Sequence, residues 1–128
     1  MPASRIAVLF DAENCAADAV APVLQQLRLR GTVCIRRAIG DFSGSLLAPW
    51  VQQARLCGIE LIMQPSLGRG KNSADIMLAV EAMDILHGGA VGAIALVSSD
   101  RDFTPLALRL RRSGLDVLGF GRAGTDGA

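Results

Sequence analysis

Short apolar segments alternate with segments of helical periodicity along the whole chain, and this alternation restricts the fold more than any other feature of the sequence. The apolar segments are mostly continuous, as expected for strands buried on both faces of a parallel sheet. Five strands are expected, at Arg5–Phe10, Thr32–Ala38, Glu60–Gln64, Ala93–Val97 and Asp116–Phe120. Four helices are expected between them, at Ala17–Arg30, Ser45–Leu56, Ala74–Leu86 and Leu106–Arg112.

This order of elements predicts one three-layer α/β domain, in which right-handed crossovers place helices on both faces of a five-stranded parallel sheet. Residues that stop or start helices support the boundaries. Gly31 and Gly58 are placed to end the first two helices, Ser73 to cap the third, and Pro105 to open the fourth. The third helix is expected to carry its apolar stripe on Ile76, Ala79, Val80 and Met83.

Length and composition fit a single globular domain. The chain has 128 residues, and we expect a domain over 1–120 followed by a flexible, glycine-rich tail over 121–128. The net charge of +1 gives no long-range attraction to nucleic acid, so any such binding needs a local patch. No signal peptide or membrane-spanning apolar run is visible, and the three cysteines are scattered, which predicts a cytoplasmic protein with reduced thiols and no membrane partner.

Several familiar motifs fail. Gly119, Gly121 and Gly124 have the spacing of a dinucleotide-binding fingerprint but lack the helix that must follow it. His87 is the single histidine and is expected at a helix end, which argues against a Ser-His-Asp hydrolase. Trp50 lies in a helical pattern, so we expect it to pack in the core rather than to stack on a base.

Acidic residues follow two of the expected strands directly. Asp11 comes after the first strand, and Asp100 and Asp102 come after the fourth. Ligand sites in open parallel sheets lie beyond the carboxyl ends of the strands, where the winding reverses. In the strand order 3-2-1-4-5 the first and fourth strands are neighbours, so Asp11 and Asp100 would face each other. Asp75, in the first turn of the third helix, and Asn14, three residues after Asp11, would lie at the same edge.

Four crowded carboxylates repel one another, and a cation is the usual compensation. Oxygen ligands without a nearby histidine or cysteine favour Mg²⁺ or Mn²⁺ over Zn²⁺, and such an ion can activate water against a phosphodiester. Each acid also has an ordinary explanation: Asp75 suits a helix N-terminus, Asp102 helps a helix to start, and Asp11 caps a turn. Their convergence on one edge favours the metal site.

At these positions the sequence resembles the NYN family, a branch of the PIN-like nuclease superfamily. The matching segments are 9–14 (LFDAEN), 70–76 (GKNSADI) leading to 82–84 (AMD), 98–106 (SSDRDFTPL) and the turn 40–42 (GDF). The likeness runs from about residue 5 to 121. Such domains commonly continue past the fifth strand, whereas this chain ends there, which leaves open whether it is a piece of a longer protein.

The resemblance implies a PIN-like strand order 3-2-1-4-5 and metal-dependent ribonuclease activity. The function we expect first is a Mg²⁺- or Mn²⁺-dependent endoribonuclease, although the sequence does not distinguish endonuclease from exonuclease action. The resemblance also implies that Asp11, Asp75, Asp100 and Asp102 hold the metal and that Asn14 belongs to the catalytic set. The alternative function is a non-catalytic module that keeps the fold and binds RNA or protein. All four acids are present, which favours the enzyme. RNA is the expected partner, and a homodimer is considered as well.

An acidic mouth repels phosphate unless positive groups flank it. Arg36 and Arg37 are expected to close the second strand, and Arg69 and Lys71 lie in the glycine-rich loop before Asp75. The last two have an equally good explanation as solvated loop charges. The residues expected to contact RNA are Arg36, Arg37, Arg69, Lys71, Ser99 and Arg101.

Overall fold

A computed structural model describes residues 4–65, 73–99 and 103–121, without the side chains of 73–75. The strands are β1 (Ser4–Asp11), β2 (Gly31–Gly40), β3 (Glu60–Met63), β4 (Ala93–Val97) and β5 (Asp116–Phe120). The helices are η1 (Ala17–Ala19, a 3₁₀ turn), α1 (Val20–Arg28), α2 (Ala48–Cys57), α3 (Ser73–Gly88) and α4 (Thr104–Arg112). All strand pairs are parallel and the order is β3-β2-β1-β4-β5, so the predicted sheet is confirmed.

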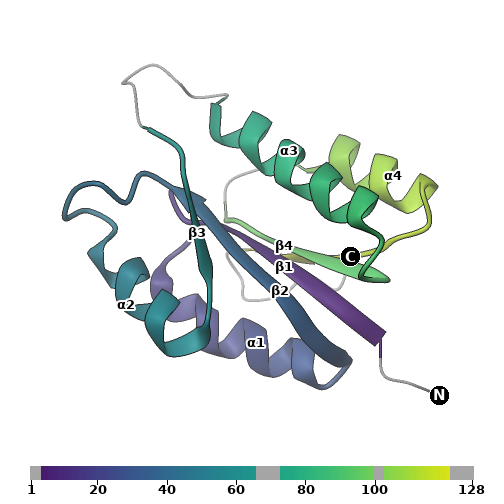
Figure 1. Ribbon diagram of the computed structural model, residues 1–128, viewed down its shortest axis with the longest axis horizontal. Helices are drawn as coiled ribbons and strands as arrows, with labels where there is room; N and C mark the ends of the chain where they lie inside the picture. The colour runs from purple at the N-terminus through teal and green to yellow at the C-terminus, as the bar shows by residue number, and fades with distance from the viewer. Residues whose placement is uncertain (1–3, 66–72, 100–102, 122–128) are drawn as a thin grey trace.

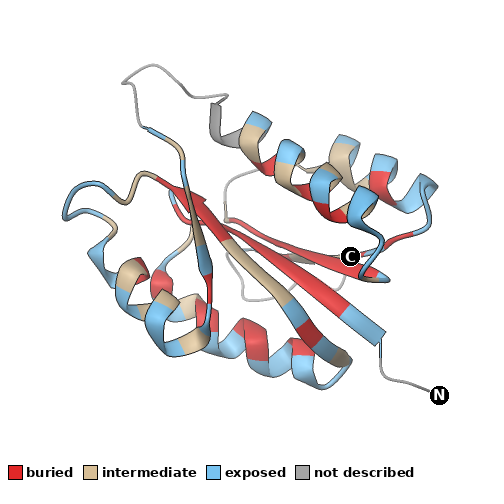
Figure 2. Ribbon diagram, viewed as in Figure 1, coloured by how far each residue is buried: buried red, intermediate tan, exposed pale blue. Residues whose placement is uncertain are grey.

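The sheet is covered on both faces, by α1 and α2 on one side and by α3 and α4 on the other (Figure 1). Successive residues of a strand point to opposite faces, and β1 shows the consequence. Phe10 packs with the α1 and α2 side, whereas Leu9 packs with the α3 and α4 side. Figure 2 shows the resulting buried centre of the sheet, where residues 7–10 of β1 have no exposed surface. No helix in these described ranges is long and apolar enough to cross a membrane.

The buried stripe of α3 differs from the expected one. The helix rests on the sheet through Leu78, Ala82 and Ile85, while Ile76 is 61% exposed and Val80 is 52% exposed. The prediction was wrong because α3 carries apolar residues around most of its circumference. Periodicity can identify such a helix but cannot determine which side faces the core.

Gly31 does not end α1, as the sequence had suggested, but begins β2. The helix stops at Arg28, and Gly31 pairs with Ser4 at the start of β1. A Cβ atom at Gly31 would lie 2.2 Å from the carbonyl oxygen of Ser4, so only glycine allows this close approach. The prediction for Gly58 is confirmed, since it ends α2 with a left-handed φ of 67°.

Candidate active site

Asp11 is the last residue of β1 and is 3% exposed at the carboxyl end of the central strand. Its Oδ2 atom accepts hydrogen bonds from Ser98 Oγ at 3.0 Å and from Asn14 Nδ2 at 3.1 Å. Ser98 follows β4, which lies beside β1 in the sheet. The two strands expected to meet at the switch point therefore do meet, and Asp11 is held at their junction.

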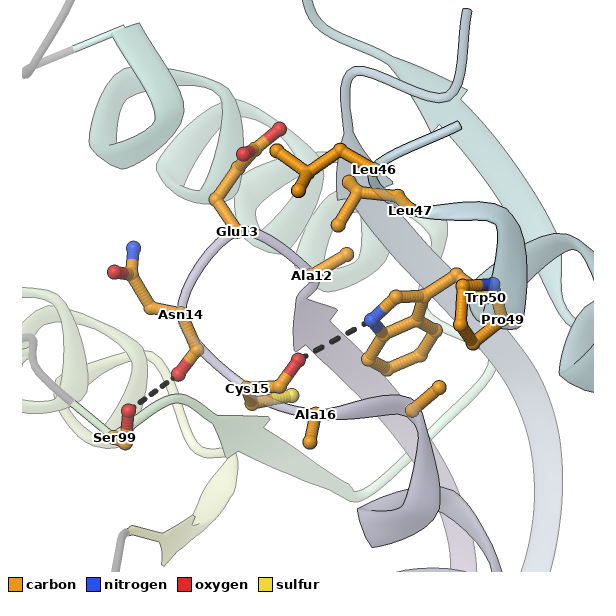
Figure 3. A pocket seen from close by; sticks show the side chains of 11 residues that line it. Ala12, Glu13, Asn14, Cys15, Ala16, Leu46, Leu47, Pro49, Trp50 and Ser99 are labelled. Atoms are coloured by element: carbon orange, nitrogen blue, oxygen red, sulfur yellow. Dashed lines mark hydrogen bonds between the residues drawn. The ribbon is translucent and has the colours of Figure 1, made fainter. Parts of the chain in front are cut away.

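The loop after β1 is fastened to the residues that follow β4. The backbone nitrogen of Ser99 donates to the carbonyl of Asn14 at 2.9 Å, and Ser99 Oγ donates to the same oxygen at 2.6 Å (Figure 3). The backbone nitrogen of Asn14 in turn donates to the Asp11 carbonyl at 3.0 Å. Asn14 and Ser99 thus lie at the edge of the sheet where the sequence placed them.

The other acids expected at this site cannot be placed by their side chains. Asp75 lies in the first turn of α3, but its side chain is not described. The remaining expected residues lie outside the described ranges; these are Asp100, Asp102, Arg69, Lys71 and Arg101. Within those ranges no group of three or more His, Cys, Asp or Glu side chains is arranged to hold a metal.

Arg36 and Arg37 do not close β2, because the strand continues to Gly40. They pair with the middle of β1, Arg36 opposite Val8 and Arg37 opposite Leu9. Being adjacent in a strand, the two side chains point to opposite faces of the sheet. They lie before the carboxyl end of β2 and on opposite faces of the sheet, so their expected position at the end of the strand was wrong.

Each of these two arginines is engaged within the fold. Arg36 Nη1 donates to the carbonyl of Cys57 at the end of α2, at 2.9 Å. Arg37 Nη1 forms ion pairs of 2.9 Å with Glu81 and with Asp84 on α3. Burial alone would lower the pKa of Arg37, but the hydrogen bond to Asp84 and the surrounding carboxylates outweigh it and raise the pKa. These contacts explain the two residues as links between the sheet and its helices.

Glu13 was not singled out from the sequence, yet it connects two loops at the site. Its Oε2 atom accepts a hydrogen bond of 2.7 Å from the backbone nitrogen of Asp41, which follows β2. A Cβ atom at Gly40 would lie 3.3 Å from that oxygen and 2.9 Å from Leu47 Cδ1, so Gly40 permits the close packing here. Two features of the sequence could have indicated this role. Glu13 lies between Asp11 and Asn14, and the turn at 40–42 follows the neighbouring strand.

A cavity of about 520 Å³ opens beside this loop (Figure 3). Its lining residues come from the loop after β1, from the segment entering α2, and from Ser99; they are Ala12, Glu13, Asn14, Cys15, Ala16, Ala17, Leu46, Leu47, Pro49, Trp50 and Ser99. Trp50 is 2% exposed, and its Nε1 donates to the Cys15 carbonyl at 3.2 Å. Its ring packs against Phe10 with centroids 5.4 Å apart, so the prediction of core packing is confirmed.

Cys15 is half-buried in this loop, and its environment opposes ionisation. Burial, followed by the charges of Asp11 and Asp18, raises the pKa of the Cys15 thiol from 9.0 to about 12. A rise in pKa from 9.0 to about 12 leaves about a thousandfold less thiolate at mildly alkaline pH. Since the folded pKa exceeds the unfolded value, this group stabilises the fold below about pH 9 and loses that contribution as pH rises towards 12.

Iodoacetamide at pH 8 should therefore label Cys34, which is exposed, well before Cys15. Peptide mass spectrometry after timed quenching measures both rates in one sample. Unfolding in guanidinium should bring the two rates together. Equal rates in the folded protein would contradict this account of the loop.

The described donors at the site are compatible with a hard divalent cation. Asp11 offers a buried carboxylate, Asn14 offers an amide oxygen, and Cys15 stays a protonated thiol. Oxygen donors of this kind suit Mg²⁺ or Mn²⁺. The described donors at this edge of the sheet therefore fit such an ion.

Similarity to known proteins extends over nearly the whole chain. The sequence model of the NYN domain matches residues 5–128. A comparison with curated proteins found no match. The fold is similar to that of a Vibrio parahaemolyticus protein of unknown function, with a TM-score of 0.70 and 21% identity over 94% of this chain and 83% of that one. A phosphoribosylglycinamide formyltransferase from Bacillus halodurans aligns more weakly, with a TM-score of 0.49 and 16% identity over 90% of this chain and 54% of that one.

Proposed function

Because this chain belongs to the NYN domain family, whose members are generally nucleases, we propose that it is a metal-dependent ribonuclease. One observation carries the proposal: the carboxylate of Asp11 is buried at the switch point of the sheet and is held by two hydrogen bonds. A carboxylate in this position lies where open parallel sheets bind their ligands, and its oxygens are of the kind that Mg²⁺ and Mn²⁺ prefer.

We assign the cation to Asp11, Asp75, Asp100 and Asp102. Bound there, Mg²⁺ or Mn²⁺ would polarise the phosphodiester as a Lewis acid. The hydroxyl of Ser98 and the amide of Asn14 fix the orientation of the Asp11 carboxylate, so that it does not have to reorganise when the ion binds. Ser99 holds the loop that carries Asn14 against β4, which keeps the two strand ends in register.

Labelled single-stranded RNA, incubated with the protein and Mn²⁺ or Mg²⁺, tests the proposal. Cleavage is expected with either ion and should stop when a chelator is added. Cleavage that persists in the chelator would contradict metal dependence. RNA binding without cleavage in either ion would favour the alternative, a binding module that retains the fold.

Positive charge near the acids is proposed to come from Arg69 and Lys71. A near-neutral domain with an acidic site needs local cations to hold phosphate. An Arg69→Ala/Lys71→Ala variant should bind RNA more weakly, and its log–log salt dependence should be shallower by about 1.4, since each single-strand phosphate contact contributes about 0.7. Fluorescence anisotropy at several salt concentrations, with catalysis prevented by omitting metal, measures both quantities.

The matched control is Arg28→Ala/Arg30→Ala, which removes two exposed arginines from the end of α1 and after it. Helices in right-handed crossovers end at the edge of the sheet opposite the carboxyl ends of the strands, so this pair is remote from Asp11. The control should keep the affinity and salt dependence of the unmodified protein. Equal losses in both variants would mean that only net charge matters.

A further inference from the structure

We infer that the cavity beside Asp11 is a subsite for a single RNA base and that it selects guanine. This inference rests on the proposed cleavage of RNA, because it supposes that a strand lies across the edge of the sheet. It adds a specificity that the acidic residues alone do not provide.

The cavity shares a wall residue with the proposed metal site. Asn14 contributes to the cavity wall and also donates to Asp11 Oδ2 at 3.1 Å. Ser99 lines the cavity from the β4 side and holds Asn14 through its carbonyl. A nucleotide whose phosphate lies at Asp11 therefore has its own base, or that of its neighbour, within reach of this space.

The size and walls of the cavity suit a flat heteroaromatic group. Its volume of about 520 Å³ falls in the range of about 300–1,000 Å³ that is typical of small-ligand pockets. Leu46, Leu47 and Pro49 form an apolar wall, and Leu46 is 84% exposed at the rim. Covering an exposed leucine with the face of a base removes apolar surface from water, which favours binding.

The polar groups of the cavity exclude phosphate and favour hydrogen-bond donors. None of its lining residues is cationic, and Glu13 contributes a carboxylate. Glu13 Oε2 is fixed by the backbone of Asp41 at 2.7 Å, while Oε1 has no hydrogen-bond partner in the described part of the chain. The carboxylate is therefore held in place with acceptor capacity to spare.

Guanine matches such a carboxylate better than the other bases do. Its N1–H and its amino group lie side by side and can donate to the two oxygens of one carboxylate. Adenine and cytosine present one amino group beside a ring acceptor, and uracil presents one N–H between two carbonyl oxygens. A carboxylate repels these neighbouring acceptors, so Glu13 discriminates by repulsion as well as by attraction.

Trp50 provides a direct probe of the cavity. It is the only tryptophan in a chain without tyrosine, and it lies in the cavity wall bonded to the Cys15 carbonyl. Titration with guanosine 5′-monophosphate in the absence of divalent metal should change the fluorescence of Trp50. The guanine nucleotide should bind about 5- to 150-fold more tightly than the adenine, cytosine or uracil nucleotides, the range expected for a bidentate base contact. Inosine 5′-monophosphate, which lacks the amino group, should bind with an intermediate affinity.

Two variants separate the carboxylate from the apolar wall. Glu13→Gln keeps an oxygen that can accept from the Asp41 nitrogen. It replaces the other oxygen with an amide NH2, which donates rather than accepts, so the preference for guanine should be lost. Leu46→Ala should weaken binding of all four nucleotides without changing their order. Leu29→Ala is the matched control, because Leu29 is 82% exposed just after α1 and touches no part of the cavity.

The outcomes distinguish this inference from the proposed ribonuclease activity. A guanine preference that Glu13→Gln removes supports the base subsite, even if the protein does not cleave RNA. Equal affinities for the four nucleotides, or a preference that survives in Glu13→Gln, would overturn it, even if RNA is cleaved in a metal-dependent manner. Equal weakening by Leu46→Ala and Leu29→Ala would overturn the assignment of the apolar wall.

Discussion

Asp11→Asn is expected to reduce RNA cleavage by more than about 100-fold while leaving the fold intact. Removing a residue that only supports a metal ligand typically lowers metal affinity or activity by about 10- to 100-fold. Asp11 is proposed to be a ligand itself, so its loss should lower activity further. Asparagine has the size of aspartate and keeps an oxygen that can accept from Ser98 Oγ, so the buried site stays filled. Initial cleavage rates at saturating Mn²⁺ measure the loss, and circular dichroism and thermal melting confirm folding.

Asp18→Asn serves as the matched control, since Asp18 is an exposed aspartate in the 3₁₀ turn that follows the same loop. It should cleave RNA at the rate of the unmodified protein. Ser98→Ala should fall between the two, with a loss of about 10- to 100-fold, because it removes a hydrogen bond that orients Asp11 but no ligand. Full activity in Asp11→Asn would show that the active site does not lie at the carboxyl end of β1, and it would contradict the proposed mechanism.

The parts of the fold that could be predicted are those in which local pattern and topology agree. Continuous apolar runs identified β1 and β4 as buried strands, and the rule for parallel sheets then placed Asp11 and the residues after β4 at the same edge. The hydrogen bond between Ser98 and Asp11 is the physical outcome of that reasoning. Asn14 and Ser99 followed because they lie within a few residues of strands whose order was correctly expected.

The parts that could not be predicted depend on contacts between distant segments. Arg36 and Arg37 were expected at the end of β2, and only the paired structure shows that the strand continues to Gly40. Gly31 looked like a helix terminator because glycine serves both in C-caps and at close backbone approaches, and only the distance to Ser4 distinguishes the two uses. Glu13 became significant only when its hydrogen bond to the Asp41 nitrogen was seen.

The site region is stabilised by contacts among three loops rather than by any one of them. Glu13 links the loop after β1 to the loop after β2, and Ser99 links it to the residues after β4. Trp50 completes the set from α2, through the Cys15 carbonyl. Asp11 can therefore be held in one orientation although it is the last residue of β1 and a loop follows it.

Trp50→Ala is expected to destabilise the fold by about 3–5 kcal/mol, the usual cost of deleting a buried tryptophan side chain. The residue is 2% exposed, packs on Phe10, and anchors α2 to the loop after β1. Trp50→Phe keeps most of the apolar volume but removes the indole N–H, so it should cost less, about 1–3 kcal/mol, for leaving the Cys15 carbonyl without that donor. Urea unfolding followed by circular dichroism measures both free energies.

Leu56→Ala is the control on the same helix, because Leu56 is 71% exposed, and it should change stability by less than about 0.5 kcal/mol. If Trp50→Ala were no more destabilising than Leu56→Ala, α2 would not be anchored through Trp50, and the wall that this side chain gives to the cavity would have no structural support.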